Sequence, residues 1–350
     1  LELDPGQRDV LMQIGSLHEA MGDFSAAEAA FQEYAEEFPE NHQVLTQLAR
    51  LARRQGNLEE ARAFYERALL LAPSNVGLMV GMGTLERAMG NFDEALNQYH
   101  EALSLAGTPE ERIQVYSAME SHHMARGQVG KSIEIMDESF TEMAVSLPSF
   151  MILLQRLTEA GTYAEAGRTE EAWGIVEQAR AELPPPYDLM APLGEMDIHL
   201  ALEDTDGLEA TLPAVETAIT TLQYELIRPT LLAAQGELHF LKGEYREAIM
   251  AFEEQRRLAP ANASVQRELG RCYRELGEYD QAVTLMQEAL AISPFGPRAN
   301  FEMALTYEAM GLMDEARVHL ARALEVWAEA DPGYKWAARA RQVSERIGRG

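Results

Sequence analysis

Seven arginines are the residues of this chain whose type and spacing best suit binding chemistry. Arg267, Arg271 and Arg274 recur at steps of four and three residues, which places them on one face of a helix. The other four stand in comparable segments of the chain: Arg50, Arg53, Arg87 and Arg298. A guanidinium is planar, and its paired N–H groups match the two oxygens of a carboxylate. The stripes therefore predict a surface that binds an acidic peptide or a chain carboxylate. They also fit an alternative, in which the arginines pair with glutamates on neighbouring helices of a very acidic protein.

Catalytic motifs are absent from the sequence. It contains no G-x-S-x-G nucleophile motif, no phosphate-binding glycine loop and no H-E-x-x-H zinc motif. His122 and His123 cannot share a metal ion from one helix, because adjacent helical side chains point about 100° apart, so we expect a surface pair. The single cysteine, Cys272, rules out an intrachain disulfide and is expected to be a small, semi-buried thiol. These residues predict no enzyme, no metal site and no cofactor.

The chain is strongly acidic. Its 350 residues include 57 Asp and Glu against 29 Lys and Arg, a formal net charge of −28. Nucleic acids and anionic membranes bind positively charged surfaces, so neither is expected as a general partner. No apolar run approaches the ~20 residues that a bilayer span requires, and no signal peptide is visible. We therefore expect a monomer without membrane insertion, in the cytoplasm, with the periplasm as the alternative compartment.

Residues 263–296 show how the arginines must be positioned. Two apolar stripes with i, i+4, i+7 spacing run through this segment, separated by Gly277 and closed by Pro294. The pattern predicts a helix–turn–helix hairpin of about 34 residues. Its two helices cannot bury both stripes alone, so the unit requires neighbours of its own kind. The stripes are Leu269, Tyr273 and Leu276, followed by Ala282, Met286 and Ala289.

The same unit recurs in register along the chain. Prolines close it with a common step at Pro5, Pro39 and Pro73, and again at Pro260 and Pro294. The glycines between paired helices are Gly22, Gly56, Gly90, Gly127, Gly167, Gly243, Gly277 and Gly311. Each is followed by a small residue that should face the partner helix: Ala27, Ala61, Ala95, Ser132, Ala172, Ala248, Ala282 and Ala316.

This pattern resembles the tetratricopeptide repeat (TPR) family. The matching features are a small residue late in the first helix of the hairpin (helix A), an aromatic residue in the second (helix B) and the closing proline. The resemblance implies an all-α, right-handed superhelix of about nine hairpins with a C-terminal capping helix. It also implies that the A helices, and with them the seven arginines, line a concave groove. The small residues are Gly15, Ala49, Gly83, Gly236, Gly270 and Ala304, and the aromatic residues are Phe31, Tyr65, Tyr99 and Phe252.

The repeats fall into groups. Residues 1–146 read as N-terminal repeats, of which 1–7 are the end of a preceding repeat, and residues 229–330 read as strict C-terminal repeats. Between them, residues 147–228 are divergent and interrupted by the triplet Pro184-Pro185-Pro186, which cannot continue a helix. We expect a distortion of the superhelix between about 144 and 228. Residues 331–350 are expected to contain the capping helix.

The expected function is non-catalytic binding of a protein or peptide in the concave groove. Because such repeats serve many ends, two alternatives stay open. The ending Trp327-Ala328-Glu329-Ala330-Asp331-Pro332 resembles the close of arrays in bacterial signalling proteins, which would make this the regulatory or sensor arm of a larger kinase or cyclase. In the other alternative, the array is a periplasmic scaffold for polysaccharide export.

Overall fold

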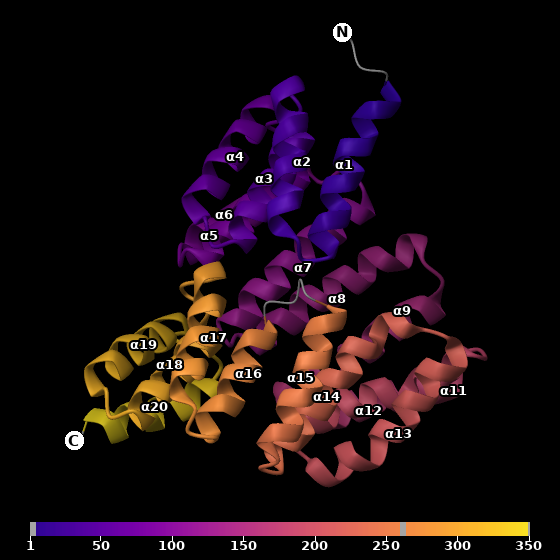
Figure 1. Ribbon diagram of the computed structural model, residues 1–350. Helices are drawn as coiled ribbons and strands as arrows, with labels where there is room; N and C mark the ends of the chain where they lie inside the picture. The colour runs from indigo at the N-terminus through magenta and orange to yellow at the C-terminus, as the bar shows by residue number, and fades with distance from the viewer. Residues whose placement is uncertain (1–4, 260–263, 349–350) are drawn as a thin grey trace.

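The computed structural model describes residues 5–259 and 264–348, with side chains from residue 10 onward. Within these ranges the chain forms helices and no strands, arranged as nine hairpins followed by one more helix (Figure 1). This confirms the predicted all-α solenoid of helical hairpins. The first four hairpins are α1 (Pro5–Ala20) with α2 (Phe24–Glu37), α3 (His42–Arg54) with α4 (Leu58–Leu71), α5 (Val76–Ala88) with α6 (Phe92–Leu105), and α7 (Pro109–Ala125) with α8 (Val129–Ser146).

The next two hairpins are less regular. Helix A of the fifth is divided into α9 (Ser149–Thr158) and α10 (Ala160–Glu165) before α11 (Thr169–Glu182). A short 3₁₀ helix, η1 (Tyr187–Met190), precedes α12 (Ala191–Leu202) and α13 (Thr205–Leu222). A second one, η2 (Glu225–Ile227), leads into the C-terminal hairpins. These are α14 (Arg228–Leu241) with α15 (Tyr245–Leu258), α16 (Ser264–Glu275) with α17 (Tyr279–Ile292), and α18 (Pro297–Ala309) with α19 (Met313–Val326); the last helix is α20 (Lys335–Gly348).

The predicted turn glycines all adopt a left-handed backbone. The φ angles of all eight lie between 71° and 88°, a region that costs a residue with a Cβ atom about 1 kcal/mol or more. At Gly277 the chain closes helix A with two bonds: the N–H of Gly277 donates to the carbonyl of Arg274, and that of Glu278 to Tyr273, both at 2.9 Å. This is the 6→1 and 5→2 pattern that satisfies free carbonyls at a helix end.

Within each hairpin, a small residue makes room for a large one. A Cβ atom added at Gly236 would fall 2.5 Å from the ring of Phe252, and one at Gly83 would fall 2.6 Å from Tyr99. These approaches are closer than real Cβ contacts allow, so the aromatic ring fills the space that glycine leaves. The eight small residues that follow the turns are fully buried, as predicted.

One boundary differs from that expected. Helix α1 already begins at Pro5, so residues 5–7 belong to the first hairpin and not to the end of a preceding repeat. Proline suits this position, because the first residue of a helix needs no N–H donor and its φ is already helical. Residues 1–4 and the predicted closing Pro260 lie outside the described residues.

In the central repeats the turns after α12 and α13 use Glu203 and Gln223, with φ of 56° and 53°, in place of glycine.

The solenoid curls until its C-terminal part contacts earlier turns, and Figure 1 shows α17–α20 beside α5–α8. The N–H of Asp331 donates to the carbonyl of Gly127 at 2.9 Å, and the N–H of Gly130 donates to the Asp331 carboxylate at 2.8 Å. Arg126 and Glu329, 203 residues apart in sequence, form an ion pair of 2.9 Å. We call this set of contacts the clasp.

The C-terminal helix α20 packs inward as a cap. Its Trp336, Ala340 and Val343 are buried in the same apolar core as residues of α8 to α13. Lys335 and Arg339 form ion pairs with Glu203, at the turn after α12, of 3.1 and 2.7 Å. Burial tends to raise the pKa of Glu203, but the two cations outweigh it and hold that pKa at about 2. In the described part of the chain, no helix is both long and apolar enough to cross a membrane.

Candidate functional site

The seven predicted arginines do not form one surface. Arg267, Arg271 and Arg274 lie on α16 within a dense network of carboxylates, and Arg298 on α18 lines a cavity beside that network. Arg50 and Arg53 lie on α3 and line a groove of the N-terminal repeats, and Arg87 lies on the neighbouring α5. The three locations have different local charge, and they suit different roles.

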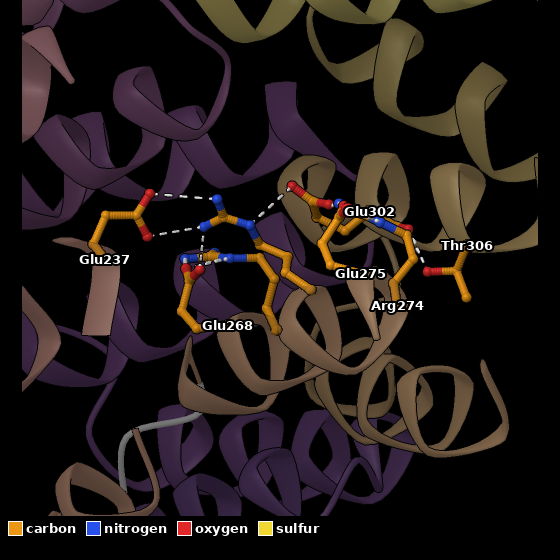
Figure 2. Close-up of polar contacts among 8 residues, drawn as sticks. Glu237, Glu268, Arg274, Glu275, Glu302 and Thr306 are labelled. Carbon is orange, nitrogen blue, oxygen red and sulfur yellow. Dashed lines mark hydrogen bonds and ion pairs between the residues drawn. The ribbon is translucent and has the colours of Figure 1, made fainter. Parts of the chain in front are cut away.

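Arg271 is the centre of the carboxylate network. Its side chain is 6% exposed and lies between A helices of three successive repeats. Its guanidinium pairs with Glu237 of α14 at 3.1 Å and with Glu302 of α18 at 3.5 Å, and it also contacts Glu268. Figure 2 shows Glu237 and Glu302 on opposite sides of this network. The guanidinium also lies 4.0 Å from the centre of the Phe240 ring, a cation–π contact.

The neighbouring arginines of α16 are occupied in the same way. Arg274 pairs with Glu275 at 2.8 Å and contacts Glu302, and the Nε of Arg267 donates to Glu268 at 2.9 Å. Burial tends to raise the pKa of Glu268 and Glu302, but the surrounding guanidinium groups outweigh it and lower both pKa values. These contacts favour the alternative stated from the sequence, in which the arginines of this stripe pair with glutamates and join adjacent A helices.

The N-terminal arginines have far fewer carboxylates around them. Arg50 lies 3.9 Å from Glu19, and Arg87 donates to the carbonyl of Ser121 at 3.2 Å. The side chain of Arg53 forms no ion pair or hydrogen bond with any residue that the structure describes. Burial lowers the pKa of Arg53, and the nearby guanidinium groups of Arg87 and Arg50 lower it further. Arg53 thus stands without a paired carboxylate, near two further arginines, in a protein with a net charge of −28.

The difference between the two regions follows from one position in the repeat. Counted from the turn glycines, Gln47 and Gly81 occupy the place that Glu268 and Glu302 occupy in the C-terminal repeats. In the C-terminal repeats this glutamate points at the arginines of its own and the preceding A helix. In the N-terminal repeats no carboxylate stands there, and the side chains of Arg50 and Arg53 line a groove instead.

Arg50 and Arg53 line a groove of about 450 Å³ between α3, α5 and α7, which we call the N-terminal groove. Gly81 allows its floor to form, because a Cβ there would fall 2.6 Å from the Tyr65 ring. Other polar side chains line the walls: His42, Gln43, Thr46, Asn75, Thr84 and Gln114. Sequence reasoning missed these residues. Thr46 was detectable, because it precedes Arg50 and Arg53 with the same four-and-three spacing.

Arg298 points toward the C-terminal cap. Its guanidinium lies 3.6 Å from the centre of the Trp336 ring of α20. Both side chains line a cavity of about 470 Å³ between the A helices of the fifth to ninth hairpins and α20, which we call the central cavity. The sequence placed Arg298 on the groove, but only the packing of the cap helix adds the wall that makes this a cavity.

The expectation of a surface histidine pair is wrong. His122 is completely buried, with its ring edge-on to Phe92 and Tyr99, and His123 is 7% exposed and shares a 2.8 Å hydrogen bond with Gln128. Burial, followed by repulsion from His123, lowers the pKa of His122 to about 3. Phe92 and Tyr99 of α6 pack on the His122 ring, and Gln128, the partner of His123, also donates to Glu329 of the clasp.

Other potential reactive groups are held in unreactive surroundings. Cys272 is fully buried, and burial raises the pKa of its thiol to about 12, so the thiolate that reacts or binds metal is disfavoured. Among the described residues, no three His, Cys, Asp or Glu side chains are grouped as metal ligands.

Comparison with known proteins identifies the repeats. A tetratricopeptide repeat family matches residues 12–76 and 233–297, and a second one matches residues 52–114 and 274–340. The chain belongs to the tetratricopeptide repeat family. Neither family matches residues 115–232, which include the divided helix A and the two 3₁₀ helices. The chain is therefore a TPR array of the kind that serves as a protein-interaction scaffold.

Among solved structures, the chain is similar to that titled "Crystal Structure of the Yeast Tom70". The sequences are 11% identical, the TM-score is 0.41, and the alignment covers 98% of this chain and 96% of that one. A search of curated proteins found no match.

Proposed function

We propose that this TPR array is a non-catalytic scaffold that binds an acidic protein segment in the N-terminal groove. The observation that carries the proposal is Arg53, a half-buried guanidinium that no described carboxylate neutralises and that lies near Arg50 and Arg87. Holding like charges together costs free energy, and an anionic ligand would recover that cost. The stripe Arg267, Arg271 and Arg274 is assigned a structural role, because its cations are already paired.

The groove supplies groups for a peptide backbone as well as for a carboxylate. Gln43 and Gln114 each carry an amide that both donates and accepts, which suits the N–H and C=O groups of an extended chain. Arg53 would hold an acidic side chain of that segment through charge-assisted hydrogen bonds. Such bonds contribute about 1.5–3 kcal/mol each, which corresponds to roughly a tenfold to hundredfold change in the dissociation constant.

The test uses a fluorescein-labelled peptide of alternating Glu and Gly and measures its binding by fluorescence anisotropy. A peptide of alternating Gln and Gly serves as the uncharged comparison. We expect Arg53→Gln to weaken binding of the acidic peptide by about tenfold or more. Arg246→Gln is the matched control, since it removes one positive charge from an exposed side chain of α15, 3.8 Å from Glu278. It should leave the affinity unchanged.

Two results would overturn the proposal. Equal binding of the acidic and uncharged peptides would show that the arginines do not select charge. Equal losses from Arg53→Gln and Arg246→Gln would show that the acidic peptide responds only to net charge. An oligogalacturonate that binds more tightly than the peptide, and depends on Arg53, would instead identify an acidic polysaccharide as the partner.

A further inference from the structure

The central cavity lies apart from the N-terminal groove and is lined by different repeats. Its walls come from α10, α12, α14, α16, α18 and α20, and its volume of about 470 Å³ falls within the range of sites for small molecules. Lys335 and Trp336 of α20 form part of the wall, and the ion pairs of Glu203 hold that helix in place. The cavity is therefore complete only when the cap is folded inward.

One cation of this cavity, Arg298, forms no ion pair with the described residues, although the carboxylates of Glu268 and Glu302 lie near enough to act on it. Arg298 forms no hydrogen bond or ion pair with any residue in the described ranges, and its Nε atom is buried. Its guanidinium packs on the Trp336 ring. This contact fixes the orientation of the guanidinium but provides no acceptor for its N–H donors. Burial lowers the pKa of Arg298. A guanidinium held flat against an aromatic ring, with free donors at its edge, is arranged to receive a carboxylate.

Two carboxyl groups of the same cavity also lack partners. Neither Asp197 of α12 nor Glu165 of α10 forms an ion pair or side-chain hydrogen bond with the described residues. Burial, followed by the charge of nearby Glu159, raises the pKa of Asp197 to about 7. The backbone of Asp197 packs against Gly161, where a Cβ would fall 2.8 Å from its carbonyl oxygen, so the position of α12 here is closely constrained.

The remaining charges around the cavity are matched among themselves. Arg267 pairs with Glu268, Lys335 pairs with Glu203, and Glu237 pairs with Arg271 outside the cavity. The unmatched set is thus one guanidinium and two carboxyl groups. A doubly charged anion such as a phosphate would be repelled by the two carboxyl groups. A cation alone would leave the N–H donors of Arg298 without an acceptor. The complementary ligand carries both charges.

We propose that the central cavity binds a small zwitterion, an α-amino acid or a dipeptide, with its carboxylate on Arg298 and its ammonium group on Asp197. This site is separate from the proposed peptide-binding function of the N-terminal groove, and either can hold without the other. Glu165 lies on the same wall and adds a second acceptor for the ammonium group.

The test begins with a thermal-shift screen of the twenty free amino acids and their glycyl dipeptides, followed by calorimetric titration of the compounds that raise the melting temperature. We expect at least one of them to bind. Its N-acetylated form and its C-terminal amide should each bind at least tenfold more weakly, because each modification removes one of the two charges. These comparisons use the unmodified protein and do not depend on the folding of any variant.

Variants then place the ligand in this cavity. Arg298→Gln and Asp197→Asn should each weaken binding about tenfold or more, whereas Arg246→Gln and Asp93→Asn, at exposed positions of α15 and α6, should not. The proposal is overturned if no compound in the screen binds. It is equally overturned if the acetylated and amidated forms bind as tightly as the parent compound, or if the two control variants lose as much affinity as the cavity variants.

Discussion

The clasp predicts that the turn glycines differ sharply in what they contribute to stability. Gly127 and Gly243 have almost the same backbone, with φ of 71° and 78°. A Cβ at Gly243 would meet nothing within 4 Å, whereas one at Gly127 would fall 2.5 Å from the Tyr334 ring and 2.8 Å from Ala330. Alanine therefore causes the same backbone strain at the two positions, but only at position 127 does its Cβ atom clash with neighbouring side chains.

The expected magnitudes follow from these contacts. Alanine in a left-handed conformation costs roughly 1–2 kcal/mol, and this applies to both variants. Gly127→Ala must also displace Tyr334, which is 6% exposed, and forcing extra atoms into packed structure costs about 1–3 kcal/mol. It further strains the hydrogen bond from Asp331 to the Gly127 carbonyl, worth about 1 kcal/mol. Gly127→Ala should thus lose roughly 2–4 kcal/mol more than Gly243→Ala.

Urea unfolding followed by far-ultraviolet circular dichroism measures this difference as a shift in midpoint. Small-angle X-ray scattering of the folded variants provides a second measure. If Gly127→Ala opens the clasp, its radius of gyration should rise while its helical content stays constant, and Gly243→Ala should change neither. Equal midpoints for the two variants, together with equal radii, would refute the inference that the C-terminal segment packs on this turn.

Two further predictions concern buried charge. Arg271→Gln leaves Glu237 and the nearly buried Glu302 without their shared cation, so it should lower the free energy of unfolding in urea by about 3–5 kcal/mol. The control Arg257→Gln removes one partner of an exposed ion pair and should change the urea midpoint little. Similar midpoints for the two variants would contradict the role of the network. His122 has a folded-state pKa below its unfolded value, so it contributes stability that is present above about pH 6.5 and is lost as the pH falls toward 3. Between pH 7 and pH 5 the loss is roughly 2 kcal/mol, and His122→Leu should remove it. His122→Leu and the wild-type protein are compared at each pH, because Glu120, whose pKa burial raises to about 7, changes the stability in the opposite direction as the pH falls. The same dependence of unfolding free energy on pH in both proteins would contradict this account of His122.

The hairpins were predictable from sequence because their causes are local. A glycine at each turn is required by the backbone angle of that turn, and a small residue such as Ala282 is required by the neighbouring helix of the same hairpin. Such requirements recur with the repeat, so they appear as a period in the sequence. The arginine stripes were found in the same way, since residues four and three apart share a helix face.

The role of each arginine depended on the tertiary structure. Arg53 and Arg274 occupy equivalent places in their repeats, yet Arg274 contacts Glu302 on the next A helix and Arg53 contacts no carboxylate among the described residues. That difference depends on the residue that an adjacent helix presents. It was visible in principle at the positions of Gly81 and Glu302, once the repeats were aligned.

The clasp, the burial of His122 and the central cavity were not predictable from the sequence pattern. The clasp and the cavity arise where segments far apart in the chain meet, as Gly127 meets Asp331 and Glu203 meets Lys335, and His122 is buried by Phe92 and Tyr99 of the preceding helix. The repeat pattern determines how each hairpin packs on the next, and the sum of those small rotations determines which distant turns meet. The sequence by itself therefore determined the unit and its stacking, and the tertiary structure decided which charges remained unpaired and what space the array enclosed.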